Sequence, residues 1–266
     1  MKGEQPKERK NGEKPEAGMQ FIRGQMNPGQ ASADRKGQSG LQTNRDICFL
    51  ETDHMKIGVI QASSQASKNR LLFDTVKKYA SGSEVINFGC KENEEPRYSY
   101  VEISVLIGLL LAGGAVDFIV TGCSSGQGMM LACNSMPGVL CGYAPSPMDA
   151  YLFAQINNGN AISLPLGENY TGSGIDNFTE TIAVLFSEPF GQGYPKSEAA
   201  RKMHDTLILK RIRKQSQINT FELLRKMDRP FVEKILCKKD VIRFISEHGT
   251  EEIRDRVRRM KDDFSA

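Results

Sequence analysis

The sequence predicts an α/β protein with a doubly wound (Rossmann-like) parallel sheet and a helical C-terminal extension. Short apolar runs that end in small polar residues alternate with segments of helical periodicity, as strands and helices do in such folds. The first run, residues 56–60, reads Lys-Ile-Gly-Val-Ile, and comparable runs recur as far as residue 164. Residues 198–263 carry helical periodicity without such runs, which predicts the extension.

The expected elements follow from this alternation. The expected strands cover residues 56–60, 84–89, 118–121, 138–142 and 161–164, and the expected helices cover residues 67–79, 99–112 and a segment after the third strand. The apolar stretch from Leu106 to Val120 is interrupted by Gly113-Gly114 and by Asp117, so it predicts a helix, a turn and a strand rather than a membrane span of about 20 residues. Ligands of parallel sheets bind beyond the carboxyl ends of the strands.

Composition excludes several classes of protein. The 266 residues can bury a core in one large domain or two small ones, and the net charge of +3 does not indicate a nucleic-acid or membrane partner. Residues 55–195 are acidic, whereas residues 196–266 are basic. Six cysteines occur without a Cys-x-x-Cys pair or a nearby histidine, which predicts free thiols in the reducing cytoplasm rather than disulfides or zinc ligands.

We expect three segments along the chain. Residues 1–54 form a leader without sustained periodicity, and its polar composition predicts disorder, with a charged interaction arm as the alternative. The leader lacks the apolar region of a secretory signal. Met55 precedes the first strand and is a candidate natural start, so the leader could lie upstream of it. Residues 55–196 form the α/β domain, and residues 197–266 form the helical extension.

A loop rich in glycine and serine follows the third strand. We call residues 122–128, Gly-Cys-Ser-Ser-Gly-Gln-Gly, the cysteine loop. A strand, such a loop and a helix N-terminus together present backbone N–H groups to a phosphate or an enediolate-like oxyanion. The spacing differs from G-x-G-x-x-G and lacks a Walker lysine, so it does not predict nucleotide binding. Because Cys123 lies beside these N–H groups, we predict that it acts as a general base or nucleophile. The alternative is that Cys123 serves only as a small buried apolar residue of the core.

The other cysteines and the histidines add no second catalytic group. Cys133 and Cys141 lie in an apolar helix and an apolar strand, so we expect them in the core. His54, His204 and His248 are scattered outside the α/β domain, and no Cys–His dyad is predicted.

The cysteine loop, followed by Asn134 and Pro137-Gly138, resembles type B ribose-5-phosphate isomerase and the related galactose-6-phosphate isomerases. The resemblance runs from Met55 to Lys196. It includes residues 155–160, Gln-Ile-Asn-Asn-Gly-Asn, together with Tyr100 and residues 190–193, Phe-Gly-Gln-Gly. Residues 64–69, Ser-Gln-Ala-Ser-Lys-Asn, resemble a longer, divergent branch of this family.

This resemblance implies an aldose–ketose isomerase that acts on a pentose or hexose phosphate through a cis-enediol, without a metal or cofactor. It implies Cys123 as the base and Ser125 as the hydroxyl that supports the thiol. The expected substrate and anion ligands are Ser124, Gly126, Gln127, Gly128, Asn157, Tyr100, Ser63, Ser64 and Lys196. The family also implies a homodimer with shared active sites, in which Asn157 and Lys196 of one chain approach Cys123 of the other.

The chain departs from the family pattern at several functional positions. Residues 61–64 replace an Asp-His pair, Ile156 replaces the ring-opening histidine, Tyr194 and Pro195 replace a phosphate-binding Arg and His, and Ser99 replaces an aspartate. Lys196 or Arg201 is left as a substitute for the phosphate ligands. These departures argue against ribose 5-phosphate and favour a different or already open sugar. The alternative function is a non-catalytic sensor that keeps the cysteine loop for sugar-phosphate binding.

The tail reads as several amphipathic helices with an interruption at residues 228–230, Asp-Arg-Pro. Arginines between residues 254 and 259 could indicate a nucleic-acid patch. Acidic residues are interleaved with them, and mixed charge of this kind favours a solvated helix face. We therefore expect no nucleic-acid or membrane partner, and a tail that packs against the core or a partner subunit.

Overall fold

The computed structural model describes residues 54–167 and 174–265. Residues 1–53 of the predicted leader therefore lie outside the described residues. The strands are β1 (Lys56–Gln61), β2 (Glu84–Asn87), β3 (Phe118–Cys123), β4 (Cys141–Tyr143) and β5 (Ala161–Pro165). The helices are α1 (Asn69–Tyr79), α2 (Tyr100–Ala112), α3 (Gln127–Ser135), α4 (Pro147–Leu152), α5 (Gly174–Leu185), α6 (Ala199–Ser216), α7 (Thr220–Arg225), α8 (Arg229–Leu236), α9 (Lys239–His248) and α10 (Glu251–Ser265). Shorter helical segments are η1 (Ser63–Lys68), η2 (Phe153–Asn157) and η3 (Lys196–Glu198).

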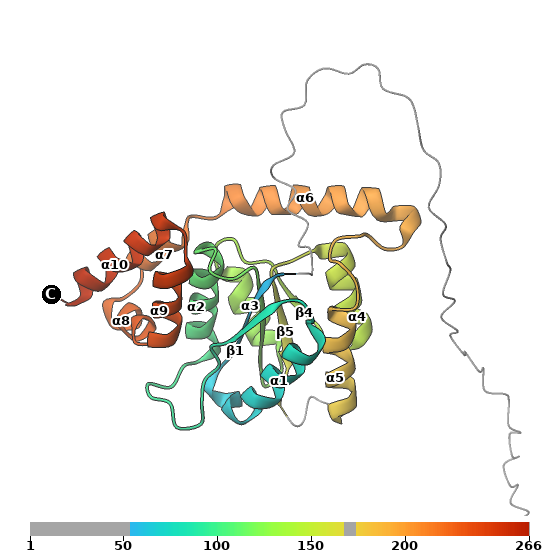
Figure 1. Ribbon diagram of the computed structural model, residues 1–266. Coiled ribbons are helices and arrows are strands. Elements are labelled where there is room, and N and C mark those ends of the chain that lie inside the picture. Colours follow the sequence, from blue (N-terminus) through green and yellow to red (C-terminus); the bar gives the residue numbers. More distant parts are fainter. Residues whose placement is uncertain (1–53, 168–173, 266) are drawn as a thin grey trace, which may run out of the picture. The chain divides into compact units, whose positions relative to one another are not determined.

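The five strands form one parallel sheet in the order β2-β1-β3-β5-β4 (Figure 1). All strands point the same way, so their last residues gather at one edge, which we call the carboxyl edge; their first residues gather at the opposite, amino edge. At the carboxyl edge Cys123 pairs with Pro165, and Gln61 pairs with Gly122.

Both faces of the sheet are buried. Val59 and Phe118 belong to one core cluster, with residues of α1 and α5, whereas Ile60 and Ile119 belong to a second cluster, with residues of α2 and α3. Burial on both faces explains why the strands read as continuous apolar runs. The predicted doubly wound α/β fold is confirmed.

Most strand ends differ from the expectation by one to three residues, and two differences have a clear physical reason. The fourth strand begins at Cys141 rather than at residue 138, because Gly138 has a φ of 74° and belongs to a turn. The first part of the expected helix 67–79 belongs to η1, where Gln65 has non-helical dihedral angles. No helix in the described ranges has the length and apolar character needed to cross a membrane.

Helix α2 is buried along almost its whole length. A capping box starts it: Ser99 Oγ accepts from the Glu102 N–H at 3.4 Å, and Glu102 Oε2 accepts from the Ser99 N–H at 2.6 Å. Nine of its residues are buried, from Glu102 to Leu110. A helix that is apolar all round needs cover on every side. The sheet covers one side of α2, and the extension covers another.

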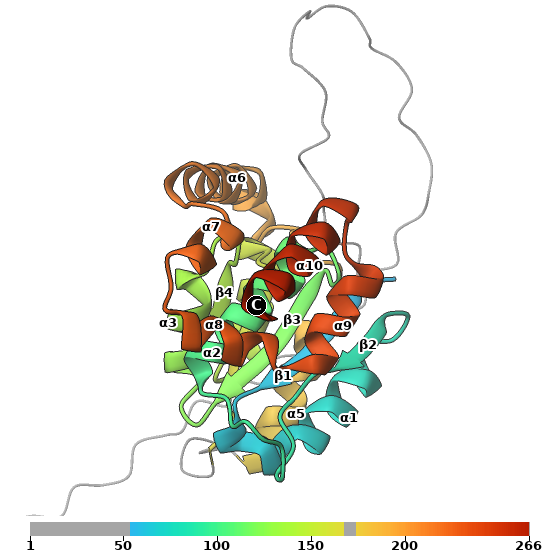
Figure 2. The same ribbon diagram turned by 90° about the vertical axis from the view of Figure 1, so that its left-hand side faces the viewer.

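Helices α7, α8 and α9 lie against α2, and α10 packs on α8 and α9 (Figure 2). Val241, Ile242 and Ile245 of α9 are fully buried in the same core cluster as α2. Lys238, before α9, is 2% exposed, and its Nζ lies 2.6 Å from Glu94 Oε1 and 3.1 Å from Asp240 Oδ2. An apolar contact and an ion pair across 144 residues of sequence therefore join the extension to the α/β core.

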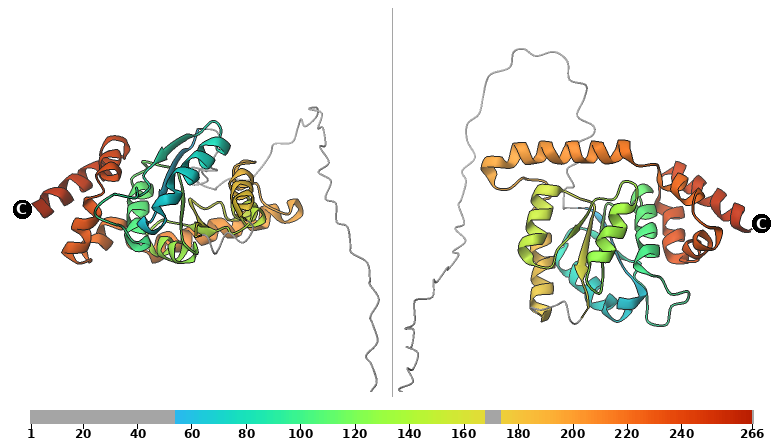
Figure 3. Two further views of the ribbon diagram at one scale, coloured as in Figure 1. Left: turned by 90° about the horizontal axis from the view of Figure 1, so that it is seen from below. Right: turned by 180° about the vertical axis from the view of Figure 1, so that it is seen from behind.

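Helix α6 runs across the amino edge of the sheet (Figures 1 and 3). Thr206 Oγ1 donates to the Ile156 carbonyl at 2.8 Å, and Arg213 Nη2 donates to the carbonyls of Asn134 and Val139. These bonds tie the helix to the turns that precede β4 and β5.

Candidate active site

The cysteine loop lies at the carboxyl edge, where β5 holds it in place. Cys123 ends β3 and is 7% exposed. Its carbonyl accepts from the Leu166 N–H at 3.0 Å, and the Ser124 carbonyl accepts from the Gly167 N–H at 2.9 Å. Ser163 Oγ donates to the Gly126 carbonyl at 2.7 Å. The chain that follows β5 therefore fixes the backbone on both sides of Cys123.

Gly126 makes the turn from strand to helix. Its φ is 75°, a left-handed conformation that glycine adopts without strain. A Cβ at this position would lie 2.9 Å from the carbonyl carbon and oxygen of Leu164 and 2.7 Å from the Tyr143 ring. Both the conformation and the space therefore require glycine here.

The loop presents free N–H groups at the start of α3. In the ranges that the structure describes, the N–H groups of Ser125, Gly126 and Gln127 donate no hydrogen bond. The first N–H groups of a helix have no acceptor within it, and the helix dipole adds partial positive charge there. The arrangement can therefore stabilise negative charge beside Cys123.

Two side chains from other elements reach this loop. A Cβ on Gly128 would lie 3.5 Å from the Tyr100 ring, so the first residue of α2 packs over the first turn of α3. Gln65 of η1 donates from Nε2 to Ser124 Oγ at 2.9 Å. Tyr100 was expected at this site from the sequence. Gln65 was not, although it lies within the motif of residues 64–69.

A network of amide side chains occupies the end of β1. Gln61 Nε2 donates to the Cys90 carbonyl at 2.8 Å, and Asn69 Nδ2 lies within hydrogen-bond distance of Gln61 Oε1 and Asn87 Oδ1, at 2.9 Å from each. Amide side chains do not titrate. This network can hold hydroxyl groups, and it supplies no group for proton transfer.

Ser63 and Ser64 follow β1 but differ in their surroundings. Ser63 is 5% exposed, and its Oγ accepts from the Tyr98 N–H at 2.8 Å. Its backbone N–H donates to the Tyr98 carbonyl at 2.9 Å, and its carbonyl accepts from Arg97 Nη2 at 3.0 Å. Ser63 thus holds the segment before α2, whereas Ser64 is exposed at the carboxyl edge.

Asn157 and Lys196 lie at the amino edge. Asn157 ends η2, before β5 begins, and is exposed. The N–H groups of Gly191 and Gly193 donate to the carbonyls of Ala154 and Gln155, at 2.9 and 2.8 Å, which holds the turn before Lys196 against η2. At about 3.3 Å per residue, the five residues of β5 separate the two edges by about 15 Å. Within one chain, Asn157 does not reach Cys123.

Positive charge near this turn is partly neutralised. Arg201, one of the two substitutes for the missing phosphate ligands, lies 2.7 Å from Glu198 and 2.9 Å from Asp205. Lys196 is exposed. Ile156 directs its carbonyl to Thr206 and has no titratable group to offer. Two carboxylates therefore offset the charge of Arg201, and Ile156 offers no acid or base.

The remaining described cysteines have core or surface positions. Cys133 and Cys141 are 0% and 6% exposed, as expected from the sequence. The neighbouring Cys133 thiol, together with burial, raises the pKa of Cys141 well above its usual value. Burial raises the pKa of Cys90 despite the Ser63 hydroxyl. Both thiols stay protonated at neutral pH. No cluster of three or more metal-ligating side chains occurs among the described residues.

Comparison with known proteins identifies the family. The sequence pattern of the Ribose/Galactose Isomerase family matches residues 57–203. The chain belongs to this family. Its members are sugar isomerases, so the chain is an enzyme of the aldose–ketose isomerase type, as the resemblance of the cysteine loop predicted. No protein of curated function matches the sequence.

Two solved structures are similar over most of the chain. One is a 4-deoxy-L-threo-5-hexosulose-uronate ketol-isomerase complexed with a tartrate, with 35% identity, 78% of this chain and 100% of the other covered, and a TM-score of 0.73. The other is the ribose-5-phosphate isomerase LacAB_rpiB from Vibrio parahaemolyticus, with 34% identity, the same coverage and a TM-score of 0.73. A type B ribose 5-phosphate isomerase from Trypanosoma cruzi, 19% identical with a TM-score of 0.51, shares the fold; the match covers 62% of this chain and 99% of that one.

Proposed function

We propose that this isomerase interconverts the aldose and ketose forms of a phosphorylated pentose or hexose through a cis-enediol, with Cys123 as the base. The observation that supports this most directly is the position of Cys123, which ends β3 immediately before the free N–H groups of α3. A base and an oxyanion site side by side are what proton abstraction next to a carbonyl requires.

The reaction moves one proton between two carbons and another between two oxygens. The Cys123 thiolate removes the proton from the carbon beside the carbonyl, and the C–H electron pair becomes part of the enediolate double bond. Negative charge grows on the former carbonyl oxygen, where the loop N–H groups stabilise it. The thiol then returns its proton to the neighbouring carbon, and the oxygens exchange the second proton.

Hydroxyl groups of the loop assist the exchange between oxygens. Ser124 Oγ accepts a hydrogen bond from Gln65, so its own O–H is left to donate to the substrate. The hydroxyl of Ser125, two residues after Cys123, supports the thiol. Ring opening has no titratable group at Ile156 or in the amide network of β1, so we propose that the enzyme takes the open-chain sugar.

We further propose a homodimer in which the amino edge of one chain completes the carboxyl edge of the other. Asn157 would bind a substrate hydroxyl, and Lys196 would bind the terminal anion, of the substrate held by the partner's Cys123. Within one chain about 15 Å separates Asn157 from Cys123, and this pairing would bring the two residues together across the dimer. The five described cysteines are all free, which suits the cytoplasm.

A sugar acid is the second candidate substrate. Glu198 and Asp205 are paired with Arg201, which leaves Lys196 as the proposed anion ligand of this turn, and a carboxylate needs less positive charge than a phosphate dianion. The similar ketol-isomerase is named for a uronate, a sugar that carries a carboxylate. This candidate keeps the proton chemistry of Cys123 and changes the anionic end of the substrate.

A substrate panel with matched cysteine variants tests the proposal. Pentose phosphates, hexose phosphates and hexuronates are assayed for isomerisation and for deuterium uptake from solvent at the carbon beside the carbonyl. We expect Cys123→Ala to lower turnover by about 100- to 10,000-fold while substrate still binds, because general-base catalysis contributes that much. Cys133→Ala removes a buried thiol of the neighbouring helix and should stay active.

Two results would contradict these assignments. Deuterium uptake at nearly the wild-type rate in Cys123→Ala would exclude this thiol as the base. Binding of a sugar phosphate by the wild type, without isomerisation or exchange of any panel member, would favour the sensor over the catalyst.

A further inference from the structure

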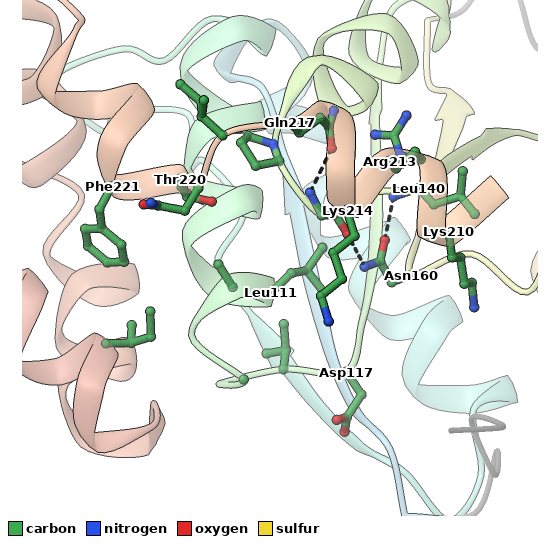
Figure 4. A pocket seen from close by; sticks show the side chains of 18 of the residues that line it. Leu111, Asp117, Leu140, Asn160, Lys210, Arg213, Lys214, Gln217, Thr220 and Phe221 are labelled. Carbon is green, nitrogen blue, oxygen red and sulfur yellow. Dashed lines mark hydrogen bonds between the residues drawn. The ribbon is translucent and has the colours of Figure 1, made fainter. Parts of the chain in front are cut away.

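A pocket of about 760 Å³ lies between the amino edge of the sheet and the C-terminal extension (Figure 4). Its walls come from the second half of α6, the residues that enter α7, the start of α10 and the residues just before β3, β4 and β5. Small-molecule sites commonly have volumes of about 300–1,000 Å³. The cysteine loop lies at the opposite edge, and none of its residues lines this pocket.

Positive charge predominates in the lining. Its charged residues are Lys210, Arg213, Lys214, Arg256, Asp117 and Glu252. Glu252 is paired with Arg256 at 2.6 Å, and Asp117 Oδ2 accepts from the Lys56 N–H at 2.8 Å. No ion pair of Lys214 is seen within the described ranges, and Figure 4 shows its side chain extending from α6 along the pocket. The cations exceed the carboxylates, which favours an anionic ligand.

Hydrogen bonds hold the polar floor of the pocket in place. Asn160 Oδ1 accepts from the Leu140 N–H at 2.8 Å, and Asn160 Nδ2 donates to the Gly138 carbonyl at 2.9 Å. The Gly138 N–H in turn donates to Gln217 Oε1 at 3.2 Å, so the end of α6 is tied to the floor. Asn158, also in the lining, is 9% exposed, and its Oδ1 lacks a hydrogen-bond partner among the described residues. Because the bonds fix α6 above the sheet, the pocket is preformed.

One wall of the pocket is apolar. Leu111, Val116, Ile218, Phe221 and Ile253 contribute to it. The Arg256 guanidinium lies 5.5 Å from the centre of the Phe221 ring. An apolar wall with a few placed polar groups is the usual composition of a site for an organic ligand.

We propose that this pocket binds a small organic anion, with a phosphate or carboxylate group at Lys214 and an apolar body against Phe221. Such a ligand would contact α6, α10 and the sheet together. Binding to the folded state then stabilises the packing of the extension on the core, since a ligand that prefers the folded chain raises its stability. This proposal is independent of the substrate proposed above.

The test compares three probes on the full chain. Phenyl phosphate, phenol and inorganic phosphate are titrated by calorimetry at low salt, and the melting temperature is recorded with each. We expect phenyl phosphate to bind more tightly than either control and to raise the melting temperature. Lys214→Glu should weaken its binding at least about tenfold, because a charge-assisted contact is lost and a repulsive one is added. Lys78→Glu, an exposed change on α1, should leave the binding unchanged.

A second variant separates this pocket from the cysteine loop. Gln127→Glu places a negative charge at the start of α3 and should weaken anion binding there, while the amino-edge pocket keeps its affinity for phenyl phosphate. Loss of phenyl phosphate binding in Gln127→Glu but not in Lys214→Glu would place the anion at the cysteine loop and overturn the pocket proposal, while the proposed function would stand. Equal binding of phenol and phenyl phosphate would also overturn it.

Discussion

Mixing two inactive variants tests the shared active site. In Cys123→Ala the base is missing, and in Asn157→Ala the proposed substrate ligand is missing. Because about 15 Å of sheet separates the two residues within a chain, an intact site needs Cys123 from one chain and Asn157 from the other. A hybrid dimer of the two variants then holds one intact site and one doubly damaged site.

The expected recovery follows from statistics. Equal amounts of the two variants, unfolded and refolded together, give hybrids as about half of all dimers. Each hybrid keeps one of two sites, so the mixture should regain about a quarter of wild-type turnover, against almost none for either variant alone. Isomerisation is measured per mole of chain, with differently tagged chains to count hybrids.

The control replaces one partner with the double variant Cys123→Ala, Asn157→Ala. Paired with Cys123→Ala it leaves no intact site, so no recovery is expected. Hybrids that form in the expected number but show no activity above the separate variants would refute the arrangement. An active monomer, seen by light scattering at micromolar concentration, would refute it as well.

Two further predictions concern folding. Lys238→Met leaves Glu94 and Asp240 without their buried cation and should destabilise the chain by about 3 kcal/mol, seen as a lower melting temperature, whereas exposed Lys239→Met should not. Burial lowers the pKa of Lys238, but the two carboxylates raise it more, so its pKa in the folded chain is above the usual value. The stabilisation by Lys238 is therefore fully present below about pH 10.5 and should disappear at higher pH. An equal loss of stability in Lys238→Met at pH 9 and at pH 12 would contradict this. Gly126→Ala forces a Cβ against Leu164 and should lower both the melting temperature and turnover. Gly128→Ala places its Cβ 3.5 Å from the nearest atom of the Tyr100 ring and should fold normally. Equal melting temperatures of the two variants would show that the loop relaxes around the added Cβ.

The fold was predictable because its signals are local. Each buried strand reads as a short apolar run, and residues 122–128 carry the glycines that a strand-to-helix turn needs. The position of Cys123 at the carboxyl edge follows from these two facts alone. Helix α5 was not predicted, although Phe178, Ile182 and Leu185 have helical spacing and are buried.

The contacts between distant segments were not predictable. Gln65 meets Ser124 across 59 residues, and Lys238 meets Glu94 across 144, and no periodicity or spacing connects such pairs. The family resemblance likewise implied that Asn157 approaches Cys123 of a second chain, without showing that the two residues lie at opposite edges of the sheet within one chain. Topology determines that separation, because Asn157 precedes its strand whereas Cys123 ends one.

The apolar surface of α2 has a consequence for biosynthesis. Its outer side is covered by helices that the ribosome makes more than 100 residues later, since Val241, Ile242 and Ile245 of α9 share its core cluster. Until those helices emerge, a growing chain whose sheet has folded exposes this apolar side of α2 to solvent, and exposed apolar surface promotes aggregation. The core around α2 is therefore complete only after the ribosome has made α9, long after the last strand of the sheet.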